Sequence, residues 1–326
     1  MGTAHADAIE DFYRGKTIRM YINSTPGAGY DVYARLVGRH MGNHIPGKPT
    51  IVAQNMPGAG GRAAAGYIYN IAAKDGLSLA ALNRSVALAQ AMEDPGIMFD
   101  NAKLNWIGSP EFDNSTLATW HTSGVRTIEE AKVKEITVGT TGDGNSSIYP
   151  RAMNLVLGTK FKIIRGYPGG NEVNLAMESG EVGGRGDNVW GSWKSARPEW
   201  LSERKINILV QIGLKKVPDL PDVPLLLDLA TNPDDHALLE LLSAPPALGH
   251  PIVISPDVPA ERVAALRAAF DAAMNDPALR DEAARIKRDI NPVSGVELAK
   301  IVGDILATPK RVRDRLASMM LGPENK

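Results

Sequence analysis

Four glycine-rich polar turns, each placed between a predicted strand and a predicted helix, constrain the fold of this chain most strongly. They cover residues 24–31, 56–61, 139–147 and 167–171. A strand, a turn and a helix repeated along a chain are typical of parallel strands joined by right-handed crossover helices. The pattern therefore predicts an α/β fold.

The pattern runs twice along the chain. In the first run we expect strands at 17–23, 50–54 and 78–82, with helices at 31–41 and up to about residue 73. It starts afresh near residue 116, with strands at 117–120, 135–139, 161–165 and 206–212 and helices at 149–157 and 171–179.

The C-terminal third is mostly helical. Helices are predicted at 261–274 and from residue 296, where Ser294 can act as the N-cap. We therefore expect two lobes and a short tail, with these bounds: 15–117 plus 230–326 for lobe one, 118–229 for lobe two, and 1–14 for the tail.

Charge and motifs exclude several classes of protein. The net charge of −1 argues against a nucleic-acid binder, and the absence of cysteine excludes disulfides and thiolate sites. The six histidines lack metal-ligand spacing, and no Gly-x-Ser-x-Gly elbow or Walker-type loop occurs. We expect no metal, no cofactor and no catalytic residue.

The N-terminus bears on the compartment. Ala4-His5-Ala6 before Asp7 has the small-x-small pattern of a signal-peptide cleavage site. This pattern favours an exported protein whose signal has been removed. The alternative is that residues 3–8 are only a flexible tail of small residues.

The glycine-rich turns also suggest a chemistry. Glycine lets a ligand approach the backbone, and the first N–H groups of a helix are unpaired donors that attract anions. One exposed helix end contributes only about 0.3–1 kcal/mol, whereas micromolar binding requires about 8 kcal/mol. Several turns must therefore act on one anionic ligand. For any single turn, tight helix–strand packing is the simpler explanation.

Particular motifs resemble those of a known family. Pro26-Gly27-Ala28-Gly29-Tyr30-Asp31 and Asn55-Met56-Pro57-Gly58-Ala59-Gly60-Gly61 resemble the opening of the Bug-type substrate-binding proteins of tripartite tricarboxylate transporters. The similarity continues through 139–144, 167–169 and 218–224, and spans about residues 15–310.

This resemblance implies a type II periplasmic-binding-protein fold with a ligand cleft between its two lobes. It implies that main-chain amides and waters of the turns at 26–31 and 140–147 hold a ligand carboxylate, and that Asp31 shapes the first turn. The expected ligand is a small organic carboxylate, and the expected partner is a membrane permease. We expect a periplasmic, monomeric and non-enzymatic protein.

The sequence departs from the family at several positions. Tyr30 replaces a small residue, Ser147 replaces a histidine, Pro168 replaces a lysine, and 183–186 (Gly-Gly-Arg-Gly) replace an apolar strand. These departures leave the ligand class open between a dicarboxylate and an aromatic acid.

Arg185 carries a specific hypothesis. The period of two in a strand predicts that Arg185 and Asp187 point to the same side, where Arg185 could clamp a distal carboxylate bidentately. The alternative is an Arg185–Asp187 or a surface ion pair. Arg84 is a second candidate clamp, and Tyr30 and Tyr167 could stack on an aromatic acid.

The candidate ligand-binding residues come from both lobes. They are Ser24, Pro26, Gly27, Ala28, Gly29, Tyr30, Asp31, Arg84, Thr140, Thr141, Gly144, Asn145, Ser146, Ser147, Tyr167, Arg185, Asp187 and Asn188. Two other functions remain open at this stage: an effector-sensing domain for a carboxylate, and an enzyme on the same scaffold.

Overall fold

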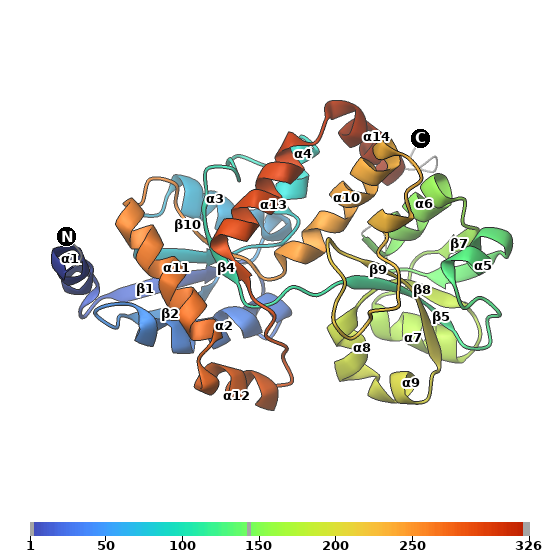
Figure 1. Cartoon of the computed structure of the whole chain (residues 1–326), viewed down its shortest axis with the longest axis horizontal. Helices are drawn as coiled ribbons and strands as arrows, with labels where there is room; N and C mark the ends of the chain where they lie inside the picture. The colour runs from blue at the N-terminus through green and yellow to red at the C-terminus, as the bar shows by residue number, and fades with distance from the viewer. Residues whose placement is uncertain (1–2, 142–144, 322–326) are drawn as a thin grey trace. The chain divides into compact units, whose positions relative to one another are not determined.

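The computed structural model of the chain describes residues 3–141 and 145–321. It divides into two compact units (Figure 1). Unit 1 contains the chain up to Phe112 together with Leu248–Ala307, and unit 2 contains Asp113–Ala247 together with the segment that begins at Thr308.

Unit 1 is built on a six-stranded sheet of order β11-β4-β10-β3-β1-β2. Strand β1 is parallel to β2 and β3, and β10 is antiparallel to β3 and β4. The strands are β1 Thr17–Ile22, β2 Thr50–Asn55, β3 Ser78–Ala81, β4 Asn105–Ser109, β10 Ile252–Ile254 and β11 Val293–Ser294.

The helices of unit 1 bury apolar faces against this sheet. Helix α2 packs on β1, β2 and α11, and the core contains Met20 of β1, Leu36 of α2 and Phe270 of α11, all fully buried. The helices are α1 Thr3–Tyr13, α2 Gly29–Met41, α3 Arg62–Asn70, α4 Val86–Ala91, α11 Ala260–Met274, α12 Pro277–Arg285 and α13 Gly295–Ala307, with 3₁₀ turns at Gly42–His44 and Ala59–Gly61.

Unit 2 has a five-stranded sheet of order β7-β6-β8-β5-β9. Strand β6 is parallel to β7 and β8, and β5 is antiparallel to β8 and β9. The strands are β5 Ser115–Trp120, β6 Ile136–Gly139, β7 Phe161–Ile164, β8 Gly184–Val189 and β9 Ile206–Ile212.

The helices of unit 2 include two from distant parts of the chain. Figure 1 shows α14 beside α10, and α14 also packs against α6. The helices are α5 Ile128–Val133, α6 Asn145–Leu157, α7 Gly170–Glu178, α8 Trp190–Ala196, α9 Pro198–Ser202, α10 Pro233–Leu248 and α14 Lys310–Leu321, with a 3₁₀ turn at Leu227–Leu229.

The glycines of β8 allow a close approach of neighbouring backbone. A Cβ on Gly186 would lie 2.2 Å from the main-chain oxygen of Ser146 in α6, and a Cβ on Gly184 would lie 2.6 Å from that of Ala118 in β5. Larger residues would push α6 and β5 away from β8. Close packing of the backbone therefore explains the glycines at 183–186. Because these residues are not apolar, the sequence pattern does not show this buried strand.

Most predicted strands begin and end within two residues of their observed bounds. Ser294 is the N-cap of α13, as predicted, because its Oγ accepts a hydrogen bond from the N–H of Glu297 at 3.2 Å. Strands β4, β10 and β11 were not predicted. Within the segment expected as a tail, 1–14, Thr3–Tyr13 form helix α1, which buries Ile9 and Tyr13.

The bounds of the units also differ from those expected. Residues 230–247 and the segment from Thr308 belong to unit 2 rather than to the first lobe. Ion pairs explain part of this difference, because Arg311 and Arg315 of α14 pair with Asp234 and Asp235 of α10 at 2.8 and 2.6 Å.

Candidate functional site

The first turn of unit 1 is held by Asp31, as the resemblance implied. The Asp31 carboxylate accepts hydrogen bonds from the N–H of Gly27 at 2.9 Å, from Asn55 Nδ2 at 2.7 Å and from Arg35 Nε at 2.8 Å. Asn55 also donates to the main-chain oxygen of Ser24 at 2.8 Å. The network ties the turn between β1 and α2 to the end of β2.

The electrostatics of Asp31 follow from this network. Burial raises the pKa of its carboxyl group. The hydrogen bonds from Gly27, Asn55 and Arg35 together lower this pKa by more than burial raises it, so the pKa lies below its ordinary value. Gly27 has a φ of +83°, which favours glycine at this position of the turn. Helix α2 starts after Ala28 without a side-chain cap, so its first N–H groups are potential donors to a ligand.

Tyr30 packs within unit 1 rather than presenting a free ring. Its hydroxyl accepts a hydrogen bond from the N–H of Arg84 at 3.1 Å, and its ring lies 4.7 Å from that of His250. Burial raises the pKa of the Tyr30 hydroxyl. His250 Nδ1 lies 2.6 Å from Glu111 Oε2. The pair formed by His250 and Glu111 was not predicted, because 139 residues separate its members.

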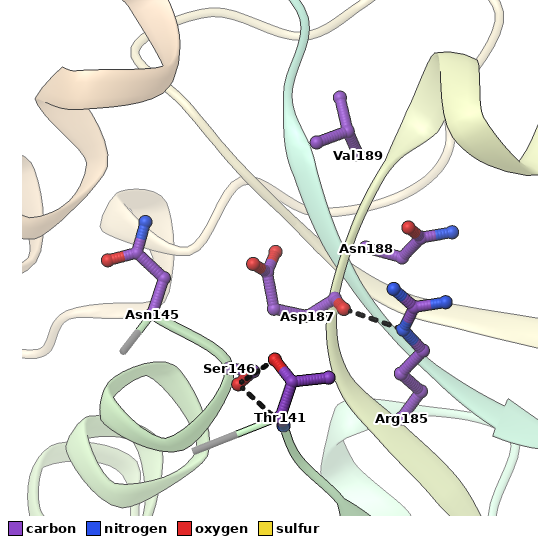
Figure 2. Close-up of a pocket in the computed structure, with 7 residues that line it drawn as sticks. All are labelled: Thr141, Asn145, Ser146, Arg185, Asp187, Asn188 and Val189. Carbon is purple, nitrogen blue, oxygen red and sulfur yellow. Dashed lines mark hydrogen bonds between the residues drawn. The ribbon is translucent and has the colours of Figure 1, made fainter. Parts of the chain in front are cut away.

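Unit 2 contains a cavity of about 290 Å³ (Figure 2). Thr141, Asn145 and Ser146 line it from the end of β6 and the start of α6, and residues of β8 line the rest. The strand contributes Arg185, Asp187, Asn188 and Val189. Of these seven lining residues, only Val189 was missing from the candidates of the sequence analysis. The structure thus brings six candidates together around one space.

Other candidates of unit 2 lie outside this lining. Thr140 and Ser147 are buried, and Ser147 Oγ donates to Thr140 Oγ1 at 2.9 Å. The hydroxyl of Tyr167 donates to Glu181 at 2.6 Å, and burial together with this bond raises the pKa of Tyr167 to about 12. Gly144 lies outside the described residues.

Arg185 makes three hydrogen bonds within unit 2. Its Nε donates to the main-chain oxygen of Asp187 at 2.9 Å, and Nη1 donates to the oxygen of Gly170 at 3.2 Å and to Asn174 Oδ1 at 2.9 Å. Within the described parts of the chain, no acceptor lies within hydrogen-bond distance of Nη2. A bidentate grip through two of its nitrogens, as expected from the sequence, is therefore not open to Arg185 in this arrangement.

The expected alignment of Arg185 with Asp187 is found only in part, because both residues line the first cavity but their charged groups extend in different directions. Thr116 of β5 pairs with Asn188 and Ala118 pairs with Arg185, so β8 carries one extra residue, which is a β-bulge. Because the bulge breaks the alternation, Figure 2 shows the Asp187 carboxylate and the Arg185 guanidinium on opposite sides of β8. Arg185 bonds to the backbone of Asp187 and not to its carboxylate.

The charge of Arg185 is costly in this position. Burial lowers its pKa to about 10, while the nearby Asp187 acts in the opposite direction. The guanidinium lies over the ring of Trp193, with its Cζ 5.4 Å from the ring centroid.

Asn188 is only 6% exposed, and its side-chain amide has no hydrogen-bond partner among the described residues. The side chains of Arg185 and Asn188 are therefore both available to a ligand.

Two further findings bear on function. The described residues include no group of three or more histidines or carboxylates placed to hold a metal ion. In the same part of the chain, none of the helices has the length and apolar character needed to cross a bilayer.

No protein-family model and no curated protein matches the sequence. Solved structures do match. A TctC solute-binding protein from Polaromonas superposes with a TM-score of 0.73 at 18% identity, covering 93% of this chain and 99% of that one. An R. palustris protein with adipate superposes with a TM-score of 0.60 at 16% identity, covering 93% of this chain and 97% of that one. MatC from Rhodopseudomonas palustris with bound malate superposes with a TM-score of 0.57 at 20% identity, covering 92% of this chain and 99% of that one. The chain therefore has the two-lobed α/β fold of the TctC-type solute-binding proteins.

Proposed function

We propose that this chain is a periplasmic solute-binding protein of the Bug type, which captures a small organic carboxylate and delivers it to a tripartite tricarboxylate-type membrane permease. It acts as a monomer after removal of a signal peptide, and it uses no cofactor and catalyses no reaction. The observation that carries the proposal is the cavity of unit 2, with its unpaired donors around Arg185 and Asn188.

The lining of this cavity suits a carboxylate that is held mainly by uncharged donors. Arg185 and Asp187 both line it, so their charges offset each other. Asn145, the first residue of α6, and Thr141 provide an amide and a hydroxyl, and the first turn of α6 provides main-chain N–H groups. A volume of about 290 Å³ lies at the lower end of the usual range for ligand pockets, which is about 300–1,000 Å³.

Relatives of the same fold support the ligand class. The structures with bound malate and with adipate both contain a dicarboxylate. A dicarboxylate is therefore the first ligand to test, and an aromatic acid is the second.

We also propose that the first turn of unit 1 donates N–H groups to a carboxylate. The support is chemical, because the uncapped start of α2 offers N–H donors like those of α6.

Calorimetric titration with C4–C9 dicarboxylates and aromatic acids tests the proposal. We expect one acid to bind with a micromolar dissociation constant, which corresponds to about 8 kcal/mol. Mass spectrometry of the purified protein would identify a retained ligand. No binding by any acid of the panel, or conversion of an acid to a product, would contradict the proposal.

The role of Arg185 has its own test. Arg185→Met should weaken a bound dicarboxylate far more than its monoacid analogue, because only the dicarboxylate presents a second charge to the guanidinium. Equal losses for the two acids would reject this role.

A further inference from the structure

A second cavity of unit 2, of about 170 Å³, has a different charge from the first. Residues of α7, β8 and α8 and the residue after α8 line it: Gly170, Asn171, Asn174, Arg185, Asn188, Ser192, Trp193, Ala196 and Arg197. Within this described lining two residues are cationic and none is acidic. The first cavity, in contrast, balances Arg185 with Asp187.

The position of Arg185 increases the positive character of this cavity. A Cβ on Gly170 would lie 2.4 Å from Arg185 Nη2, so the guanidinium lies directly against the first turn of α7. The N-terminus of a helix carries partial positive charge. A buried guanidinium beside it, without a carboxylate in contact, is unfavourable unless an anion balances both.

Two buried asparagines have donors without acceptors at the same place. Asn174 is 3% exposed, and its Oδ1 accepts from Arg185, but its Nδ2 has no acceptor in the described segments. Asn188 is 6% exposed, and its amide has no partner there either. Neither amide nitrogen is among the fully buried side-chain atoms that lack a partner, so both remain accessible as donors. Both amides belong to the lining of the cavity.

Nearby acids balance this charge only in part, because Asp187 favours the charged form of Arg185 but is absent from the lining of the second cavity. Glu172, in the first turn of α7, is exposed and is absent from the lining. The Asp187 carboxylate lies on the other side of β8 from the guanidinium (Figure 2). Arg197 adds a second positive charge, and its Nη1 donates to the main-chain oxygen of Ala196 at 2.9 Å.

We propose that this second cavity binds a small inorganic oxyanion, such as sulfate, phosphate or bicarbonate, at a position that shares Arg185 and Asn188 with the first cavity. Arg185 Nη2 and the amides of Asn174 and Asn188 donate to the oxyanion, with the hydroxyl of Ser192, and Arg197 supplies the second positive charge.

Calorimetric titration of the desalted protein tests this proposal. Sulfate, phosphate and bicarbonate are titrated separately at constant ionic strength set with chloride, and the comparison of the three shows which oxyanion the cavity prefers. We expect one of them to bind once per chain. Arg197→Gln should weaken this binding about tenfold, since a hydrogen bond or contact with a charged group is lost, and Ser192→Ala should weaken it several-fold.

Lys194→Gln is the matched control, because it removes one positive charge three residues before Arg197, at a residue of α8 that does not line the cavity. It should leave oxyanion binding unchanged. Absence of binding by all three oxyanions, or equal effects of Arg197→Gln and Lys194→Gln, would overturn the proposal.

A variant at a residue of the second cavity alone separates this proposal from the proposed function. Saturating oxyanion should weaken binding of the organic acid, because Arg185 and Asn188 line both cavities. Arg197→Gln, at a residue absent from the first lining, should leave the affinity for the organic acid unchanged. An equal loss of oxyanion and organic-acid binding in Arg197→Gln would show a single site and overturn the inference. Because sulfate binding is measured without any organic acid, failure of the whole acid panel would contradict the proposed function alone.

Discussion

The polar turn of unit 1 and the polar cavity of unit 2 use similar residues in opposite ways. In unit 1 the Asp31 carboxylate is satisfied by Gly27, Asn55 and Arg35. In unit 2 the amide of Asn188 has no partner within the described residues, and Arg185 has no carboxylate in contact. The comparison indicates that the first network stabilises the fold, whereas the second set of groups is available for binding.

The largest expected effect is on ligand affinity at Arg185. Arg185→Met should weaken the tightest dicarboxylate at least about thirtyfold, which is about 2 kcal/mol, because a buried charged group is removed from the complex. The free energy of unfolding should change by less than about 2 kcal/mol. Three hydrogen bonds are lost, but the burial of an uncompensated charge is relieved.

Calorimetry and urea unfolding check these two quantities, and Lys194→Met is the control for the loss of one positive charge. A large loss of stability with unchanged affinity would assign Arg185 to the fold and would remove the contrast between the units.

The next effect is on stability at the first turn. Asp31→Ala should lower the free energy of unfolding by about 1.5–3 kcal/mol, because three donors lose a charged, buried acceptor. Urea unfolding measures the loss, and Asp304→Ala, an exposed carboxylate on α13, is the control. If both substitutions cost the same, the network around Asp31 does not stabilise unit 1.

A third prediction concerns the packing that shapes the cavity. Gly186→Ala should lower the free energy of unfolding by about 1–3 kcal/mol, because the new Cβ would lie 2.2 Å from the main-chain oxygen of Ser146. Gly303→Ala in α13 is the matched control, since nothing lies within 4 Å of its Cβ, and it should stabilise the protein by about 0.5–1 kcal/mol. Thermal unfolding compares the pair. A neutral Gly186→Ala would mean that α6 can move away from β8 without cost.

The smallest effect is the dependence of stability on pH at Asp31. Its pKa in the folded protein is lower than the ordinary 3.8, so its stabilising contribution is complete above that value and is lost as pH falls through the lower folded pKa. The wild-type protein should therefore lose more stability between pH 5 and pH 2 than Asp31→Asn does. Parallel pH profiles for the two proteins would contradict this.

The sequence predicted the parts of the fold that depend on local patterns. The strand at 17–23, the helix of Asp31 and the N-cap Ser294 are specified by neighbouring residues, and they were found close to their observed bounds. The membership of α10 and α14 in unit 2 depends on contacts such as Arg315–Asp235, between residues 80 positions apart. Local patterns contain no information about such contacts.

The site was predictable to a similar extent. Thr141 and Asn145 were candidates because they lie in a polar turn at the end of a strand, where open α/β sheets bind ligands. The side of β8 to which Arg185 points depends on the bulge opposite Thr116 and Ala118, which is a property of pairing with β5. The second cavity was missed because Asn174, Arg185 and Arg197 come from three different parts of the chain.

The central claim is that the first cavity of unit 2 binds a small organic carboxylate. Hydrogen–deuterium exchange, measured with and without the tightest acid of the panel, tests it most directly. We predict slower exchange at the amides of residues 145–148, in the first turn of α6, when the acid is bound. Unchanged exchange at these amides would contradict the account.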